Sequence, residues 1–471
     1  MEKLSLLGKR STEVPRGEKE ERTRFEMGGC VGTKKGLGAV LRIALGVMSL
    51  LAFVLFTSLF GRLLAAQDLP NMWKGISPAG LLSAGLVGSS SATLLYVASY
   101  AGTITTLNLT LPEDGDAAAA TLETISTSTG CGQSPSWLTL DYSKSFLFCT
   151  DEGLNEEDGG LSTLFTNDNG TLTHLSTIEV ILGPVAIAQY GVGGHGLALA
   201  QYSGSTVTAV GMTPDGGLEL VQNETYALEQ PGPNASRQEA PHPHDAILDP
   251  AAAFVLVPDL GADLVRVYQA NPDDLSLTDV EPLVAAPGSG PRHGVFKTVL
   301  DKTYFYLVAE LANTITGYEV TYNENKTLSF AELFVIPTHG EDVDLPEGTG
   351  AAEILLSPDQ NFLIVSSRWE NSTTIPSFDS SNGTIPSDPL INFSIDRETG
   401  SLTKLQEFPA GGLGPRQFSI NAAGDLLAVG LQADGRVVLI ERDVKTGLLK
   451  DFVAHANIEG EITAAIFYED S

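Results

Sequence analysis

The sequence predicts an all-β fold, a seven-bladed β-propeller, preceded by an N-terminal signal or signal-anchor segment. Three observations lead to it: a strand-rich unit recurs along the chain, no helical pattern separates its strands, and one uncharged apolar run stands near the N-terminus. We divide the chain into a basic polar tail (1–42), a hydrophobic signal or anchor segment (43–60), a linker with a candidate ring-closing strand (61–88) and the propeller (89–471).

The repeated unit is a small or Pro-led turn, a strand, a turn near Asp or Pro, a second strand and, after a short gap, a third. Seven copies begin at Ala92, Ser134, Gly183, Pro241, Gly290, Gly350 and Gly414. Four-stranded units without helices are typical of propeller blades around a central channel. The final segment, EITAAIFYED, is suited to pair with strands near the start and close the ring. An array of β-sandwiches would need linkers between domains, and the sequence shows none.

Composition and charge agree with this fold. The chain contains 49 Gly and 25 Pro in 471 residues, and only 18% of residues are charged, which suits short strands joined by tight turns. Residues 71–471 hold 51 Asp/Glu against 16 Lys/Arg. Such a surface repels nucleic-acid phosphates and anionic lipid, so we expect neither as a partner.

The N-terminal run is IALGVMSLLAFVLFTSLF, from Ile43 to Phe60. It approaches the roughly 20 residues that cross a bilayer. Basic residues before it favour a cytoplasmic N-terminus, so the propeller would be lumenal or extracellular. Cleavage within GRLLAA (61–66) and retention as a type II anchor both remain open. We therefore expect passage through the secretory pathway, with membrane contact only through residues 43–60.

Sequons and cysteines point to the same compartment. Eight N-x-S/T sequons follow the apolar run, at Asn108, Asn169, Asn223, Asn234, Asn325, Asn371, Asn382 and Asn392. The segment 373–389 is expected to be a solvated, glycosylated loop. Cys131 and Cys149 are the two cysteines after the run, and an oxidising compartment would pair them. Two buried free thiols are the alternative.

Aligning the copies shows two columns of mostly polar residues. The first holds Ser136, Ala186, His244, His293, Glu353 and Gln417, and the second holds Asp151, Gln201, Asp259, Glu310, Arg368 and Gln432. The first column opens a blade's innermost strand, and the second closes the antiparallel strand beside it. Both columns are therefore predicted to ring one mouth of the channel as a ligand site. Turn chemistry is the competing explanation, since polar residues commonly begin and end strands.

Three stretches of the repeat resemble the seven-bladed propeller lactonase family, which includes bacterial 6-phosphogluconolactonase and fungal carboxy-cis,cis-muconate cyclase. They are PHPHDAILDPAAAFVLVPDLGADLVRVY, GPRH followed by YLVAELANTITGY, and AAEILLSPDQNFLIVSSR. The resemblance covers roughly residues 90–460. Carried over by motif, the family's catalytic residues fall on His244, Arg292, Glu310 and Arg368. The Asn that the family has before the last two is Ala and Ser here, which leaves the substrate's identity open.

The resemblance implies a lactonase that hydrolyses a sugar-acid or related lactone, and the N-terminal run and sequons place it in an extracytoplasmic compartment. An arginine would stabilise charge on the carbonyl oxygen, and His244 would act as acid or base, with Glu310 orienting it or acting as the base itself. We expect substrate-binding roles for His293, Glu353, Arg416 and Gln417. The alternatives are a muconate-cyclase-like intramolecular lyase and a non-catalytic propeller that binds a ligand or partner. We expect a monomer that acts on a small lactone or organic acid, without a cofactor or a metal.

Overall fold

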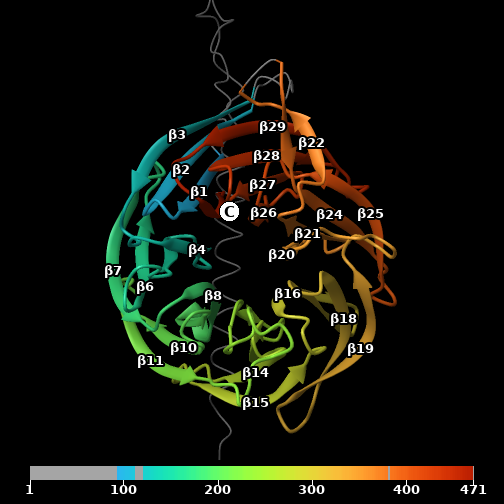
Figure 1. Cartoon of the computed structure of the whole chain (residues 1–471). Helices are drawn as coiled ribbons and strands as arrows, with labels where there is room; N and C mark the ends of the chain where they lie inside the picture. Colours follow the sequence, from blue (N-terminus) through green and yellow to red (C-terminus); the bar gives the residue numbers. More distant parts are fainter. Residues whose placement is uncertain (1–92, 112–119, 380–381, 470–471) are drawn as a thin grey trace, which may run out of the picture. The chain divides into compact units, whose positions relative to one another are not determined.

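The computed structural model describes residues 93–111, 120–379 and 382–469. Seven four-stranded antiparallel sheets follow one another around a central axis, which confirms the predicted number of blades (Figure 1). Apart from the 3₁₀ turn η2 (Val192–Gly194), the described ranges contain no helix.

Each blade runs from an innermost strand at the axis to an outermost strand at the rim. The first blade has β30 (Ile462–Tyr468), β1 (Thr93–Ser99), β2 (Thr103–Thr110) and β3 (Thr121–Ser128). The second has β4 (Pro135–Leu140), β5 (Phe146–Asp151), β6 (Gly159–Thr166) and β7 (Leu172–Val180), and the third has β8 (Pro184–Tyr190), β9 (Gly196–Gln201), β10 (Thr206–Met212) and β11 (Leu218–Thr225). The fourth has β12 (Ile247–Leu248), β13 (Phe254–Asp259), β14 (Leu264–Ala270) and β15 (Leu277–Val284).

The last three blades follow the same order. The fifth has β16 (Pro291–Val299), β17 (Lys302–Ala309), β18 (Thr314–Tyr322) and β19 (Leu328–Pro337). The sixth has β20 (Gly350–Leu356), β21 (Phe362–Arg368), β24 (Pro389–Ile395) and β25 (Leu402–Pro409). The seventh has β26 (Pro415–Ile420), β27 (Leu426–Leu431), β28 (Arg436–Arg442) and β29 (Leu449–Asn457).

The C-terminal segment closes the ring, as predicted. Strand β30 is the innermost strand of the first blade and pairs antiparallel with β1, with Val97 opposite Ala465. The ring is thereby held together by strands from the two ends of the propeller sequence. The basic tail, the apolar segment 43–60 and the candidate closing strand in 61–88 lie outside the described residues. Among the residues that are described, none forms a helix long and apolar enough to span a membrane.

The core lies between neighbouring blades. Central strands are buried on both faces because each blade packs face to face against the next. Val207 of the third blade, for example, shares a cluster with Val255 and Tyr268 of the fourth. Outer strands such as β11 are largely exposed. The propeller therefore forms a rigid ring whose axis is lined by the first residues of seven inner strands.

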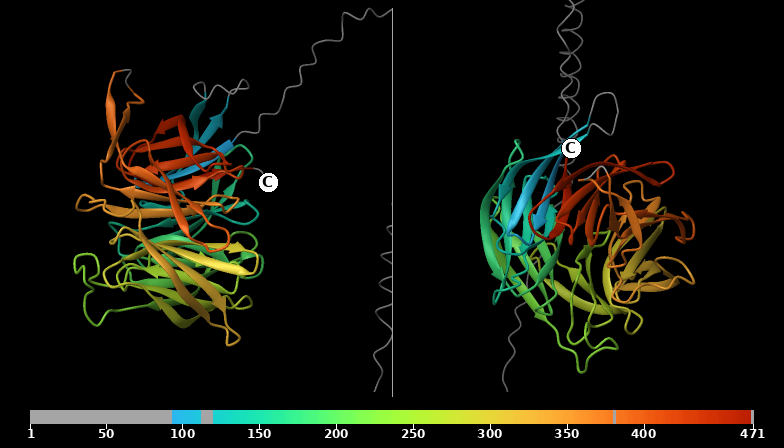
Figure 2. Two further views of the ribbon diagram at one scale, coloured as in Figure 1. Left: turned by 90° about the vertical axis from the view of Figure 1, so that its right-hand side faces the viewer. Right: turned by 45° about the horizontal axis from the view of Figure 1, so that its top comes forward.

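The segment expected to be a loop after β21 contains a hairpin. Strands β22 (Thr373–Pro376) and β23 (Thr384–Ser387) pair antiparallel and project from the sixth blade (Figure 2). Arg436 of β28 holds its far end through an ion pair of 2.8 Å between Nη2 and Asp379 Oδ2. The chain between β21 and this hairpin begins with Trp369.

The structure forms the predicted Cys131–Cys149 disulfide, with the Cα atoms 5.7 Å apart. Six sequon asparagines are exposed: Asn169, Asn223, Asn234, Asn325, Asn371 and Asn382. Asn108 is half-buried. The prediction for Asn392 is wrong, because this side chain is fully buried in β24 and its amide donates to the Gly447 carbonyl. The folded protein has no room for a glycan there.

Candidate active site

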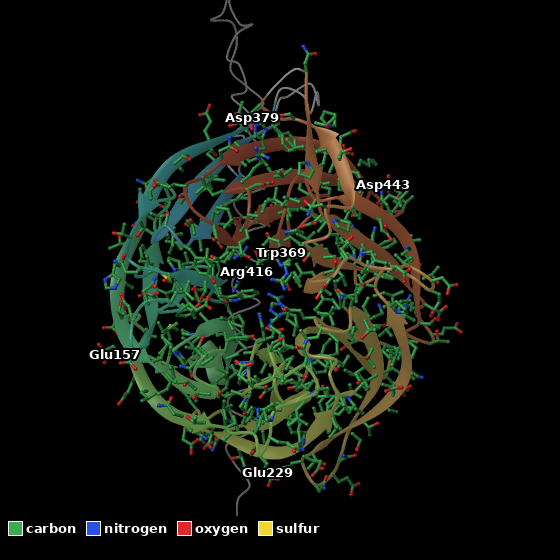
Figure 3. All side chains as sticks on the ribbon, viewed as in Figure 1. Glu157, Glu229, Trp369, Asp379, Arg416 and Asp443 are labelled. Carbon is green, nitrogen blue, oxygen red and sulfur yellow. A yellow bond between two sulfur atoms is a disulfide. The ribbon has the colours of Figure 1, made fainter. Side chains whose placement is uncertain are left out.

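Two inner strands each begin with a β-bulge, which turns an arginine out of the regular pairing between strands. In β16, Pro291 lies opposite Ala309 and His293 opposite Val308, so Arg292 has no partner residue. The same shift in β26 leaves Arg416 without one. A bulge re-aims a side chain that strict alternation would direct elsewhere. It brings Arg292 against Glu310, and it places Arg416 close to the axis (Figure 3).

Glu310, directly after β17, is bound by three arginines from three different segments. Its Oε1 lies 2.7 Å from Arg237 Nη2. Its Oε2 lies 2.9 Å from Arg292 Nε and 2.9 Å from Arg368 Nη2. Arg292 and Arg368 are buried with it, whereas the side chain of Arg237 is 41% exposed. One carboxylate thus collects three positive charges, and the group carries a net positive charge.

In this cluster the pKa of the carboxylate and the pKa of two of the guanidinium groups are lowered, for different reasons. Burial alone would raise the pKa of Glu310, but Arg368, Arg292 and Arg237 outweigh it and lower this pKa to about 2. Burial, followed by repulsion from Arg368, lowers the pKa of Arg292 to about 9. Burial also lowers the pKa of Arg368, although Glu310 opposes it. Glu310 is therefore a fixed anion near neutral pH and a poor proton acceptor.

The cluster opens into a cavity of about 600 Å³. Its wall is formed by Asn234, Ser236, Arg237, Glu310, Leu311, Glu347, Gly348, Thr349, Gly350, Arg368, Trp369, Arg416 and Gln432. Arg416 is the third guanidinium of this wall, beside Arg237 and Arg368, and lies 3.8 Å from Glu152. Arg292 binds Glu310 but is not itself a wall residue. A cavity of this size suits a small organic ligand, and its arginines suit a carboxylate or a phosphate.

A second group of titratable side chains is formed by His244, His293 and Glu353 of the first column. His244 Nδ1 is 3.2 Å from His293 Nε2, and His293 Nδ1 is 3.1 Å from Glu353 Oε1. Trp137 and Tyr202 hold this row edge-on: the Trp137 ring lies 5.6 Å from that of His293, and Tyr202 lies 5.5 Å from His244. The three polar side chains are buried. They form a continuous hydrogen-bonded row, so the protonation state of Glu353 affects the hydrogen bonding of His244.

The pKa values of this row follow from burial and from the arginines beside it. Burial, then Arg292, lowers the pKa of His293 to about 3. The pKa of His244 is lowered well below its usual value by burial, Arg292 and His293. Burial raises the pKa of Glu353 to about 7, with Arg292 opposing the rise. Both histidines are therefore neutral at neutral pH, and Glu353 is the group whose charge changes there.

The two columns do not ring one mouth, which corrects the prediction. Glu310, Arg368 and Gln432 of the second column line the 600 Å³ cavity. His293, Glu353 and Gln417 of the first column line a separate cavity of about 350 Å³, together with Trp137, Tyr142 and Asp245. Apart from His244, which precedes β12, the first-column residues lie inside an inner strand, whereas the second column lies at or beyond the end of the neighbouring strand. The columns therefore occupy two levels of the channel.

Turn chemistry accounts for several of the other column residues. Asp151 accepts hydrogen bonds from the backbone of Gln133 and Ser134, and Asp259 accepts from His242. Gln417 Oε1 accepts from the Ala465 backbone at 2.7 Å and so ties β26 to β30. Its predicted substrate-binding role stays a prediction. Within the described ranges, no group of three or more His, Cys, Asp or Glu side chains is placed to hold a metal ion.

Sequence comparison supplies the family. A family model described as "Lactonase, 7-bladed beta-propeller" matches residues 88–465. The chain belongs to the seven-bladed β-propeller lactonase family. A protein of the fungus Arthroderma benhamiae named "Probable 6-phosphogluconolactonase" is 28% identical over 372 residues, which cover 78% of this chain and 86% of the relative. A 6-phosphogluconolactonase of Formosa agariphila is 26% identical over 277 residues, 58% of this chain and 71% of the relative.

Solved structures agree on the fold of this lactonase-family chain. The periplasmic gluconolactonase of Pseudomonas aeruginosa superposes with a TM-score of 0.64 at 23% identity and covers 80% of this chain and 99% of its own. A protein from Lactobacillus plantarum gives a TM-score of 0.65 at 24% identity, covering 80% of this chain and all of its own. At these identities the likeness concerns the fold.

Three residues of the candidate site were not found from the sequence. Arg237 comes from the long loop between β11 and β12, outside the repeat, so no column contains it. Tyr202 follows the column residue Gln201, and its ring stacks on His242 at 4.1 Å. Trp369 follows Arg368 and lines the larger cavity. For Tyr202 and Trp369, the available signal was that each directly follows a column residue.

Proposed function

We propose that this lactonase-family protein hydrolyses the lactone of a sugar acid or a related acid in an extracytoplasmic compartment. The observation that supports it is the Glu310 carboxylate held by Arg237, Arg292 and Arg368 at the wall of a cavity that also carries Arg416. Net positive charge at a water-accessible cavity suits an ester whose reaction develops negative charge on oxygen. The names of the relatives, both 6-phosphogluconolactonases, agree with this class of substrate.

In the proposed reaction, a water oxygen bonds to the lactone carbonyl carbon, and negative charge develops on the carbonyl oxygen. Arg368, on the cavity wall, stabilises that charge, typically by a few kcal/mol for one good donor. Arg292, on the same Glu310 oxygen but not on the wall, adds positive charge to the site. The bond from this carbon to the ring oxygen then breaks, and the ring oxygen takes up a proton. Glu310 holds the arginines in place and is unsuitable as the base, because both of its oxygens are already bound by guanidinium groups.

His244 is proposed to move the proton. If Glu353 is ionised, His293 Nδ1–H donates to it and His293 Nε2 accepts from His244 Nδ1–H. This assignment leaves the lone pair of His244 Nε2 free to take a proton from the attacking water and return it to the ring oxygen. His244 is not part of the cavity wall, so a bridging water would carry the proton between them. Glu353 and His293 are positioning residues in this scheme.

The test is a hydrolysis screen of the purified chain against neutral aldonolactones, a 6-phosphorylated aldonolactone and carboxylated butenolides. Turnover of at least one sugar-acid lactone is expected, with anionic members preferred. Arg292→Gln should abolish it, whereas Arg397→Gln, at an exposed arginine remote from the cavity, should not. A chain that binds lactones without turning any over would contradict the proposal and favour a binding propeller.

The excess of arginines also supports a second candidate, a muconate-cyclase-like intramolecular lyase. A polycarboxylate substrate would find a guanidinium for each carboxylate. The extracytoplasmic setting, proposed from the six exposed sequons and the disulfide, fits this candidate less well. Carboxylated butenolides in the screen separate the two: ring opening to an unsaturated acid, without addition of water, would identify the lyase.

A further inference from the structure

Trp369 combines three features that packing alone does not require. It follows Arg368 directly, it is 41% exposed, and its backbone has φ = 69°. A bulky residue with positive φ is a strained outlier, and such strain concentrates at functional sites. The side chain lines the 600 Å³ cavity (Figure 3). A large apolar ring is thus held at the wall of an otherwise polar, arginine-rich cavity.

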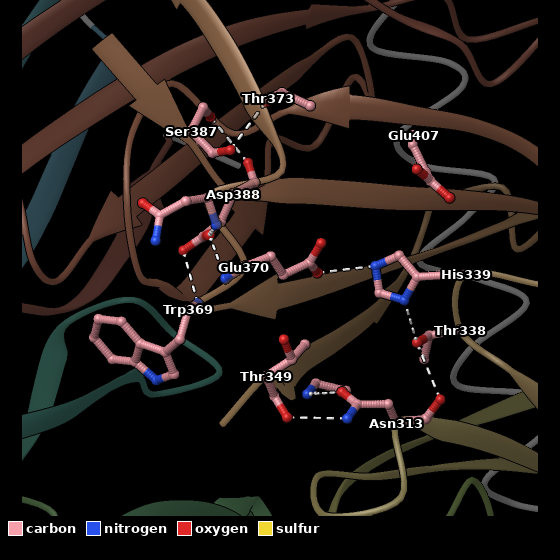
Figure 4. Close-up of polar contacts among 12 residues, drawn as sticks. Asn313, Thr338, His339, Thr349, Trp369, Glu370, Thr373, Ser387, Asp388 and Glu407 are labelled. Atoms are coloured by element: carbon pink, nitrogen blue, oxygen red, sulfur yellow. Dashed lines mark hydrogen bonds and ion pairs between the residues drawn. The ribbon is translucent and has the colours of Figure 1, made fainter. Parts of the chain in front are cut away.

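A buried carboxylate holds the strained backbone in place. Asp388 is fully buried, and its Oδ2 accepts from the Trp369 N–H at 3.0 Å (Figure 4). Its Oδ1 accepts from the Glu370 and Asn371 N–H groups at 2.9 Å each. Oδ2 also accepts from the Gly414 N–H at 2.8 Å. Four charge-assisted hydrogen bonds therefore over-determine this turn.

The neighbours of the turn are also fixed. Glu370 Oε1 lies 2.9 Å from His339 Nε2, and both side chains are buried (Figure 4). The indole lies over Gly414, where a β-carbon would meet Trp369 Cη2 at 3.2 Å. A side chain at Gly414 would crowd the ring. The indole thus packs on a glycine from the next blade, and the turn that carries it is held by the Asp388 carboxylate and by the contact between Glu370 and His339.

We propose that Trp369 is a stacking platform for the ring of the substrate, which makes it a specificity-determining residue for pyranose- or furanose-type sugar-acid lactones. The inference deepens the proposed function and rests on it. A sugar-type ring presents polarised C–H groups on one face, and these suit the electron-rich face of an indole. An anionic group on the same ligand would meet Arg237, Arg368 or Arg416 on the same wall. These arginines disfavour a cationic ligand on the ring.

The experiment uses D-glucono-1,5-lactam, a ring analogue of the lactone that resists hydrolysis, so binding is measured without turnover. Calorimetric titration and quenching of indole fluorescence report binding to the whole chain. Trp369→Gly removes the ring and suits the positive φ, so the backbone is not strained by the change. Trp369→Phe keeps an aromatic face. Leu300→Gly is the matched control, because Leu300 is also exposed (81%), has φ = 56° and lies outside the cavity.

Trp369→Gly is expected to weaken lactam binding about five- to tenfold. The KM for D-glucono-1,5-lactone should rise by the same factor with kcat within about twofold, since the ring does not touch the reacting atoms. Trp369→Phe and Leu300→Gly should bind within about twofold of wild type. Unchanged lactam affinity in Trp369→Gly, or no binding by wild type, would overturn the inference. Lactam binding that depends on Trp369, in a chain that hydrolyses no lactone, would uphold the platform and refute the proposed function. Lactone turnover with an unchanged KM in Trp369→Gly would refute the stacking platform and uphold the proposed function.

Discussion

Two glutamates of this propeller are equally buried and yet differ in pKa by about five units. The side chain of Glu310 is 6% exposed and has a pKa lowered to about 2, whereas that of Glu353 is 4% exposed and has a pKa raised to about 7. Burial favours the neutral acid in both. Glu310 meets three guanidinium groups, while Glu353 meets a neutral histidine through one oxygen and has no hydrogen-bond partner on the other. The charge of the neighbouring groups, more than the extent of burial, therefore makes Glu310 a fixed anion and Glu353 an acid that titrates near neutral pH.

The largest effect is expected from Glu310→Gln. The amide cannot neutralise three arginines, and their mutual repulsion displaces the groups that stabilise the oxyanion. We expect lactone kcat/KM to fall by about 10³ or more and the free energy of unfolding by about 3 kcal/mol, as for a broken buried ion pair. Steady-state kinetics and urea unfolding measure both. Wild-type turnover in a folded Glu310→Gln protein would show that the cluster is not part of the mechanism.

Arg368→Lys is expected to lower kcat/KM about 10²-fold. Lysine keeps the charge but loses the planar fork that lets one guanidinium reach Glu310 and a ligand together. The sequence places Arg368 in a column predicted to ring a mouth of the channel. The structure buries Arg368 against Glu310, so a modest loss of stability of about 1 kcal/mol should accompany the change. Full activity in Arg368→Lys would leave a simple ion-pair role.

The pH dependence of stability distinguishes the second glutamate from the first. Because the folded-state pKa of Glu353 lies above its unfolded value, folding binds a proton here. Its contribution to stability is complete below about pH 4.5 and is lost as the pH rises through about 7. Glu353→Gln should remove that slope and be about 2 kcal/mol more stable, relative to wild type, at pH 8 than at pH 5.

Urea unfolding at pH 5, 6, 7 and 8 measures this difference. Asp245 has its pKa raised to about 6 by burial and by Glu353, with His293 opposing, so part of the slope survives in the variant. Parallel curves for wild type and Glu353→Gln would mean that Glu353 is already ionised in the folded protein throughout this range.

Arg237→Ala should have the smallest effect. This arginine is 41% exposed, and Glu310 keeps two buried partners without it. The KM for an anionic lactone should rise about fivefold, with kcat and the melting temperature nearly unchanged, because exposed ion pairs contribute little to stability. A loss as large as that of Arg368→Lys would place Arg237 at the reacting carbonyl group.

The fold was predictable from the sequence because blade periodicity repeats the same information seven times. Ring closure by β30 and the Cys131–Cys149 pair followed from position and compartment. Arg292, Glu310 and Arg368 were found because they occupy repeat or motif positions. Arg237 was missed, since it comes from a loop that no repeat predicts. Asp388 was also missed, although Asp263 and Asn313 hold the same place, directly before the third strand of their blades. The sequence also did not predict which cavity each column borders. An alignment column gives the position of a residue along its strand, but not the cavity that its side chain reaches.

The most direct test of lactone hydrolysis by the arginine cluster is turnover of the best lactone in H₂¹⁸O. Hydrolysis at the carbonyl carbon adds a solvent oxygen, so we expect enzyme-dependent formation of a hydroxy acid with one ¹⁸O in its carboxylate. The rate should exceed the uncatalysed rate and fall about 10³-fold in Glu310→Gln. A ring-opened product without ¹⁸O would identify elimination by a lyase, and a rate equal to the uncatalysed one would contradict catalysis at this site.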